Sequence, residues 1–207
     1  MAPYPYLGLY YGPVQAGKTT CMVQEVIRRA LEGWKCLVIK FSIDVRRVQG
    51  NSIMTHGGTL LTEEQHSNIK IQIWDKDSIS TEDFALASKA HDLIAIDEAH
   101  FMREGLLSKA YEEVVKNNGK AMLASIINTW HDLTPVKGLC DVINFAEKAK
   151  MKMAHCHRCR EKRAIYSLKV TKEVGEGKIL VGGIDEYKPV CRVCLDRINN
   201  PNQKMIT

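Results

Sequence analysis

The feature that most constrains this chain is the string Gly12-Pro13-Val14-Gln15-Ala16-Gly17-Lys18-Thr19, which fits G-x-x-x-x-G-K-[ST] at every fixed position. Strand-forming residues from Leu7 to Tyr11 precede it, and a helical pattern from Thr19 to Leu31 follows. Glycines in such a turn let backbone N–H groups curl around phosphates at the positive end of a helix. The sequence therefore predicts a phosphate-binding loop. A tight glycine turn before a helix is the simpler alternative.

This loop predicts specific contacts to a nucleotide. The Lys18 ammonium group is expected to reach the β- and γ-phosphates, and the Thr19 hydroxyl is expected to serve Mg²⁺. We expect the following residues to contact the nucleotide or its Mg²⁺: Gly12, Gln15, Ala16, Gly17, Lys18, Thr19 and Thr20.

Strand and helix patterns alternate through the first two thirds of the chain. Continuous apolar runs at residues 36–39 and 93–96 are typical of strands buried on both faces, and residues 121–127 are also strand-like. Alternation at Ile69, Ile71 and Ile73 predicts a half-exposed strand, and apolar residues at helical spacing from Leu106 to Val115 predict a helix. The fold class is therefore α/β, with a mostly parallel sheet flanked by helices.

Two acids follow the buried run at residues 93–96. The carboxyl ends of parallel strands face the ligand crevice of such a sheet. Asp97 is therefore expected to hold the Mg²⁺ hydration shell, and Glu98 is free to act as a base. An exposed acidic turn is the alternative. His100, in the string D-E-A-H, is interpreted as a packing or supporting histidine.

Four of the seven cysteines form two C-x-x-C pairs separated by 31 residues, Cys156/Cys159 and Cys191/Cys194. Two such pairs can close a tetrahedral zinc site, and four thiolates leave no open position, so the zinc is expected to be structural. His155 or His157 could replace a ligand, and two unrelated reduced pairs are the alternative. The remaining cysteines, Cys21, Cys36 and Cys140, are expected to be small buried hydrophobes.

The pattern changes along the chain. Residues 1–150 are expected to form the nucleotide-binding α/β domain, and residues 151–207 a small β-rich zinc domain with a frayed tail after about residue 198. Residues 44–67 are polar and lack a clear period, which predicts a long functional or mobile loop.

Composition narrows the function classes. The chain has no apolar run long enough for a membrane span and no basic, apolar leader at its start, so we expect a cytoplasmic protein without a membrane partner. A net charge of +5 is mild for 207 residues. Its short basic clusters indicate either a solvated face or a site for an anionic ligand or nucleic acid; the mild charge favours the solvated face, and we expect no nucleic-acid partner.

Together these residues resemble the type II thymidine kinases, the zinc-containing family of cells and large DNA viruses, from about Leu7 to Leu195. Asp44-x-Arg46 resembles the family's D-x-R motif, and Thr55-His56 its T-H dipeptide. Val181-Gly182-Gly183 with Tyr187 resembles the lasso loop that closes over the nucleoside.

The resemblance implies transfer of the γ-phosphate of ATP to the 5′-hydroxyl of thymidine. It implies Glu98 as general base, Arg46 beside the transferring phosphoryl group, and Asp44 with Asp97 near the nucleotide and Mg²⁺. A homotetramer is implied, and feedback inhibition by dTTP is left open. The implied nucleoside-binding residues are Val14, Phe101, Trp130, Ser167, Val181, Gly182 and Tyr187.

The base pocket departs from the family pattern. The usual P-M-F-S-G-K-S has Val14 in place of methionine and Gln15 in place of an aromatic residue, and the usual D-E-G-Q-F reads D-E-A-H-F. The A-L-D-G-T-F segment appears as residues 125–130, with Ile127 where an acid is expected. Either Ser167 or Tyr166 could take the place of a pocket threonine.

Three other functions are alternatives to thymidine phosphorylation. One is a kinase with an altered nucleoside preference, and the second is a non-catalytic nucleotide-binding relative. Retained Lys18, Thr19, Asp97 and Glu98 argue against the second. The third is a zinc-containing, nucleic-acid-stimulated ATPase, and 207 residues leave no room for the second α/β domain that such motors use.

Overall fold

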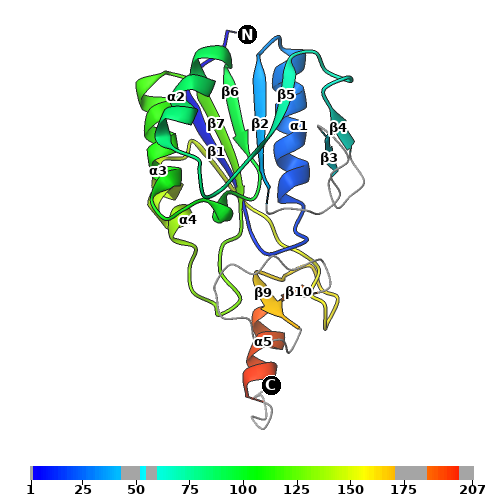
Figure 1. Cartoon of the computed structure of the whole chain (residues 1–207). Coiled ribbons are helices and arrows are strands. Elements are labelled where there is room, and N and C mark those ends of the chain that lie inside the picture. Colours follow the sequence, from blue (N-terminus) through cyan, green and yellow to red (C-terminus); the bar gives the residue numbers. More distant parts are fainter. Residues whose placement is uncertain (1, 43–51, 55–59, 171–185, 201–207) are drawn as a thin grey trace.

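A six-stranded, fully parallel sheet forms the centre of the molecule, as the sequence predicts (Figure 1). The computed structural model describes residues 2–42, 52–54, 60–170 and 186–200. The strand order is β5-β2-β6-β7-β1-β8. The strands are β1 (Tyr6–Tyr11), β2 (Cys36–Phe41), β5 (Ile69–Trp74), β6 (Leu93–Ile96), β7 (Ala121–Ile126) and β8 (Lys148–Met151).

Successive residues of the central strands face two separate cores, which explains why those strands are continuously apolar. In β1, Leu7 and Leu9 enter one core, whereas Tyr6 and Tyr10 enter the other. The edge strand β5 buries only alternate residues at its start, in agreement with its predicted half-exposed character.

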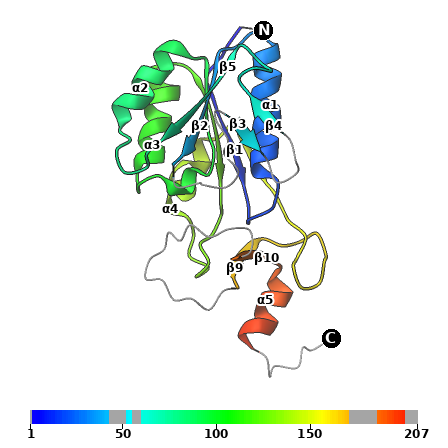
Figure 2. The ribbon, with the colours of Figure 1, turned by 45° about the vertical axis from the view of Figure 1, so that its right-hand side comes forward.

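Helices cover both faces of the sheet (Figures 1 and 2). α1 (Lys18–Leu31) packs on one face, and α2 (Thr81–Ala90), α3 (Leu106–Tyr111) and α4 (Lys137–Val142) pack on the other. Short turns η1 (Ala99–Phe101), η2 (Glu112–Asn117) and η3 (Ile143–Phe145) complete the connections. The helical pattern predicted from Leu106 to Val115 is present, but it widens to a π-helix at η2.

Part of the polar stretch at residues 44–67 is regular. β3 (Ser52–Met54) and β4 (Leu60–Thr62) form an antiparallel pair. The side chains of Ile53 and Leu61 are fully buried in the core beside α1 and anchor this pair. Asp44, Arg46 and Thr55-His56 lie outside the described residues.

A small module follows β8 and lies beyond the carboxyl ends of the sheet strands (Figures 1 and 2). β9 (Tyr166–Lys169) and β10 (Tyr187–Val190) form an antiparallel pair, and α5 (Arg192–Asn199) follows. The sequence predicts a β-rich module but not α5, whose eight residues begin directly after a cysteine and bury only Cys194 and Leu195. The division near residue 150 stays a prediction; β8 ends at Met151.

The three cysteines outside the two C-x-x-C pairs differ in burial. Cys36 is buried and Cys21 half-buried, but Cys140 is exposed on α4, because the outer face of this short helix points to solvent. Within residues 2–42, 52–54, 60–170 and 186–200, no helix combines the length and apolarity needed to cross a membrane.

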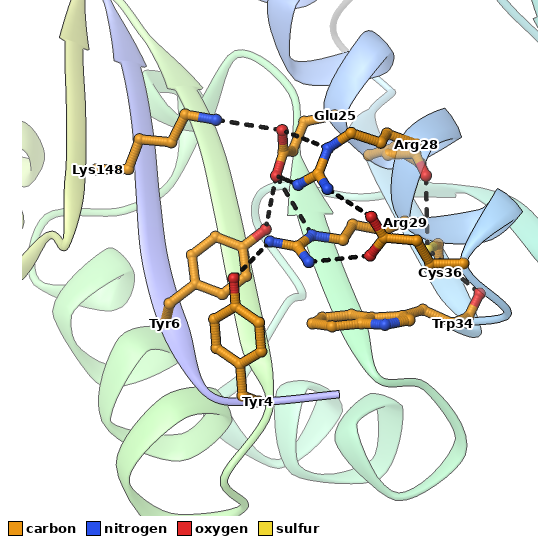
Figure 3. A network of polar contacts seen from close by, with 10 residues as sticks. Tyr4, Tyr6, Glu25, Arg28, Arg29, Trp34, Cys36 and Lys148 are labelled. Atoms are coloured by element: carbon orange, nitrogen blue, oxygen red, sulfur yellow. Dashed lines mark hydrogen bonds and ion pairs between the residues drawn. The ribbon is translucent and has the colours of Figure 1, made fainter. Parts of the chain in front are cut away.

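A buried ionic and aromatic network holds the first residues of β1 against α1 and β8 (Figure 3). Glu25 accepts hydrogen bonds from Lys148 Nζ at 3.1 Å and from the Tyr6 hydroxyl at 3.3 Å. The Arg29 guanidinium lies 4.5 Å from the Trp34 ring centroid, and it also lies over the Tyr4 and Tyr6 rings. Burial alone would raise the pKa of Glu25, but the neighbouring cations lower that pKa to about 2.

Glu25→Gln is expected to lower the free energy of unfolding at pH 7 by about 2–3 kcal/mol, because the neighbouring cations lose their ionised carboxylate partner. The folded pKa lies below the ordinary value of 4.5, so this contribution is present above pH 4.5. This contribution fades as the pH falls toward 2, where the two proteins should have similar free energies of unfolding. Urea denaturation at several pH values measures the difference between them. Glu64→Gln, on an exposed side chain, is the control, and equal losses in the two variants would contradict the prediction.

Candidate functional site

The phosphate loop connects β1 to α1 at the carboxyl edge of the sheet. Its two glycines take backbone conformations that other residues rarely adopt, with φ of 146° at Gly12 and 77° at Gly17. The Lys18 side chain is buried under the loop, and its Nζ donates to the carbonyl oxygen of Pro13 at 2.9 Å. The loop therefore folds over its own lysine side chain, as a phosphate-binding loop requires.

Asp97, directly after β6, meets the first turn of α1. The Thr19 hydroxyl donates to Asp97 Oδ1 at 2.8 Å, and the Ser125 hydroxyl from β7 donates to the same oxygen at 2.6 Å. Asp97 is almost fully buried. A hydroxyl and a carboxylate oxygen side by side are the hard oxygen donors that Mg²⁺ prefers, so these residues fit that ion.

Glu98 has a left-handed backbone, with φ of 52°, which is uncommon for a residue other than glycine. Its carboxylate oxygen Oε2 lies 3.3 Å from Nδ1 of His100, and both side chains are mostly buried. The His100 ring also contacts the rings of Phe101 and Trp130, with centroid distances of 4.3 and 5.7 Å. These contacts match the interpretation of His100 as a packing and supporting residue.

A pocket of about 370 Å³ opens beside this histidine. Phe101 and Trp130, which are distant in sequence, both line it. Charged residues at the rim of the pocket form two ion pairs. Lys76 Nζ lies 2.6 Å from Asp77 Oδ1, and Lys137 Nζ lies 3.7 Å from Glu104 Oε1. Apolar walls remain as a surface for a flat ligand.

The small module touches the phosphate loop directly. The backbone N–H of Val14 donates to Ser167 Oγ at 3.0 Å. Tyr166, the alternative to Ser167, instead packs under the guanidinium of Arg192, at 5.0 Å from the ring centroid. Tyr187 lies near His131, with 6.2 Å between the ring centroids. Ser167 is therefore the member of the pair that lies against the loop.

The remaining residues of the predicted site fall into two groups. Ala16 packs against the core of the module, Gln15 is exposed at the loop tip with φ of 59°, and Thr20 is half-buried in α1. The rest lie outside the described residues: Asp44, Arg46, Val181 and Gly182.

The four paired cysteines converge into one cluster, and their sulfur atoms all lie within 4.8 Å of one another. Sγ of Cys159 and Sγ of Cys191 are 3.8 Å apart. Zinc–sulfur bonds of about 2.3 Å at tetrahedral angles place two sulfurs about 3.8 Å apart, so the cluster fits zinc. The expectation that the two pairs join in one group is therefore correct.

The surroundings of Cys156 favour its thiolate. Burial would raise the pKa of the Cys156 thiol, but backbone N–H groups donate to its sulfur and lower that pKa to about 6. Arg163 donates to the sulfurs of Cys159 and Cys191, which raises the pKa of its guanidinium. A tetrathiolate zinc site carries a net charge of about −2, so Arg163 offsets that charge.

Two residues that make contacts at the site are not identified by the sequence motifs. Ser125 is a fully buried polar residue in the apolar run of β7, and that anomaly was the available signal. Asn128 donates from Nδ2 to the carbonyl oxygen of Ile165 at 2.9 Å and so joins the end of β7 to the module. No local pattern distinguishes this asparagine from an ordinary turn residue.

Comparisons with known proteins all give the same family. The thymidine kinase family matches residues 6–195, a range that includes the phosphate loop, the acidic pair and all four paired cysteines. The thymidine kinase of Choristoneura fumiferana entomopoxvirus is 29% identical over 196 residues, which cover 92% of this chain and 96% of the relative. That of Myxoma virus (strain Lausanne) is 30% identical, covering 90% and 93%. Thymidine kinase 1 of Dictyostelium discoideum is 26% identical, covering 92% and 77%.

Cys156→Ser is expected to reduce bound zinc from about one ion per chain to near zero, because a structural zinc site needs all four ligands. Elemental analysis of the gel-filtered protein measures this content. Cys140→Ser removes an exposed thiol outside the cluster and should retain the metal. Equal zinc content in the two variants would refute the assignment of the cluster.

Gly12→Ala is expected to destabilise the protein by about 2 kcal/mol more than Gly17→Ala. Both positions have positive φ, but a Cβ at position 12 would lie 2.2 Å from the carbonyl oxygen of Lys152. A Cβ at position 17 meets nothing within 4 Å. Urea unfolding of the two variants provides the comparison, and similar losses would show that the loop and residue 152 separate freely.

Proposed function

The chain belongs to the thymidine kinase family, and on that premise we propose that it transfers the γ-phosphate of ATP to the 5′-hydroxyl of thymidine, giving dTMP. The observation that carries this proposal is the meeting of Thr19 with Asp97, beside Glu98, at one edge of the sheet. Phosphoryl transfer needs positioned charge more than covalent chemistry, and this edge supplies positioned charge.

The phosphate loop and Asp97 would hold the nucleotide. Mg²⁺, when bound with ATP, supplies positive charge that neutralises the β- and γ-phosphate oxygens. Thr19 and Asp97 would hold it, while Lys18 would donate to the same phosphates. Arg46 and Asp44 are assigned to this group by the family resemblance alone.

Glu98 would act as the general base. Its carboxylate would accept the proton of the 5′-hydroxyl as that oxygen attacks the phosphorus. The His100 contact and the left-handed backbone at Glu98 support this role, because they restrict where the carboxylate can point. A restricted base needs less ordering when the substrate arrives.

Phe101 and Trp130 would supply the aromatic walls for the thymine ring, in the pocket of about 370 Å³. Val14, Ser167 and Tyr187 would complete the binding site from the loop and the module, together with Val181 and Gly182. A site closed on several sides keeps water from the phosphoryl group and so limits hydrolysis of ATP.

Zinc would have a structural role. The cluster of four cysteines anchors the module whose Ser167 contacts Val14 of the phosphate loop. Loss of the metal would therefore loosen the nucleoside side of the site before it affects the nucleotide side. The assembly into a homotetramer and the cytoplasmic location also belong to this proposal, and dTTP binding at the same site would provide feedback inhibition.

Glu98→Gln is expected to lower kcat for thymidine by about 10²–10⁴-fold, because glutamine cannot accept the proton. ATP affinity should change little, since the phosphate loop is untouched. The measurement is direct quantification of dTMP from zinc-loaded, reduced protein with Mg-ATP, with deoxyuridine, deoxycytidine and purine deoxynucleosides as alternative acceptors.

Glu64→Gln, an acid-to-amide change on an exposed side chain, is the matched control and should retain wild-type kcat. Transfer chiefly to another deoxynucleoside would retain the chemistry and replace thymidine as substrate. Nucleotide binding without transfer to any nucleoside would refute the proposed activity and favour a non-catalytic relative. ATP hydrolysis dependent on nucleic acid would favour the ATPase.

A further inference from the structure

Ser125 is the one residue of β7 whose side chain joins both acids of the site, among the contacts that the described residues make. Its hydroxyl donates to Asp97 Oδ1 at 2.6 Å and accepts from the backbone N–H of Glu98 at 3.0 Å. The serine is fully buried. A buried hydroxyl with both its donor and its acceptor in use is tightly fixed, because leaving either group unpaired is costly.

We propose that Ser125 is a positioning residue for phosphoryl transfer, which fixes Asp97 for Mg-nucleotide binding and Glu98 for proton acceptance. This inference rests on the proposed function for its catalytic half. The nucleotide-binding half depends only on the contacts of Asp97.

The first half of the argument concerns Asp97. Two hydroxyls, from Thr19 and Ser125, converge on the single oxygen Oδ1. The Asp97 carboxylate therefore has one favoured rotamer, in which Oδ1 accepts both hydrogen bonds. Without the serine, one of these two hydroxyl contacts would be lost, and binding of the metal would have to supply more of the ordering of the carboxylate.

The second half concerns Glu98. Its left-handed backbone costs about 1–2 kcal/mol for a residue with a Cβ, and the hydrogen bond from its N–H to Ser125 offsets part of this cost. With this backbone, the Glu98 carboxylate lies against His100, with Oε2 3.3 Å from Nδ1. One hydroxyl thus couples the direction of the base to the orientation of the metal-side acid.

By the family resemblance, residues 125–130 correspond to the segment A-L-D-G-T-F, in which the first residue is alanine. The serine therefore adds two hydrogen bonds at a position where alanine would fill the same buried space. A test by Ser125→Ala removes those bonds with little change in packing.

The first measurement is the kinetics of Ser125→Ala with thymidine and Mg-ATP. We expect kcat to fall by about tenfold and the KM for thymidine to stay within about twofold, because the serine touches neither substrate. Ser125→Thr retains the hydroxyl and should recover most of kcat. Ser88→Ala is the matched control, since Ser88 is also fully buried and donates to a carbonyl oxygen in α2.

The second measurement needs no turnover. Calorimetry gives the affinity for ADP with Mg²⁺ and with a chelator, and the ratio of the two affinities reports the contribution of Mg²⁺. We expect this ratio to fall about fivefold or more in Ser125→Ala and to stay at the wild-type value in Ser88→Ala.

The outcomes separate the two proposals. A wild-type protein that phosphorylates no nucleoside refutes the proposed function, and the Mg²⁺ ratio then decides the role of Ser125 alone. An unchanged ratio in Ser125→Ala overturns the inference, as does a loss of kcat that Ser88→Ala reproduces. Urea unfolding of all variants identifies a loss that merely follows stability.

Discussion

Parallel pairing of three adjacent strands, β6, β7 and β1, is the constraint on which the site depends. Pairing in register aligns Ile96 with Ala124, and Tyr11 with Ile126, so all three strands end at one edge of the sheet. The residues that follow these ends are the phosphate loop, the acidic pair and the segment that carries Trp130. Backbone hydrogen bonds buried on both faces fix this edge rigidly, and rigidity is what positioned charge requires.

A second constraint is the contact between this edge and the cysteine module. Gly12 approaches the backbone of Lys152 so closely that a side chain cannot fit, and the Lys152 N–H donates to the Tyr11 carbonyl at 2.7 Å. Val14 bonds to Ser167, and Asn128 to Ile165. The module is thus joined to the edge at three points, and the cysteine cluster supplies the stability that so small a core lacks.

The opposite edge of the sheet serves stability. There Glu25 and Arg29 bind the start of β1, the end of α1 and β8 into one buried network. The network is far from the phosphate loop along α1, at the other end of the same helix. One helix therefore has its N-terminal end at the proposed site and its C-terminal end in the network that stabilises the fold, so the two functions act through separate side chains.

The sequence alone determined the α/β class, the phosphate loop, the acidic pair and the pairing of the cysteines into one group. Each depends on residues close together in the chain or on a ligand chemistry that dictates spacing. Only the tertiary structure decided that Ser125 joins Asp97 to Glu98, that His100 contacts Glu98 between Phe101 and Trp130, and that Ser167 rather than Tyr166 meets the phosphate loop. It also decided that Ile53 and Leu61 anchor β3 and β4. The physical reason is that these contacts join segments whose neighbourhood is set by strand order and packing, which leave no period or spacing in the sequence.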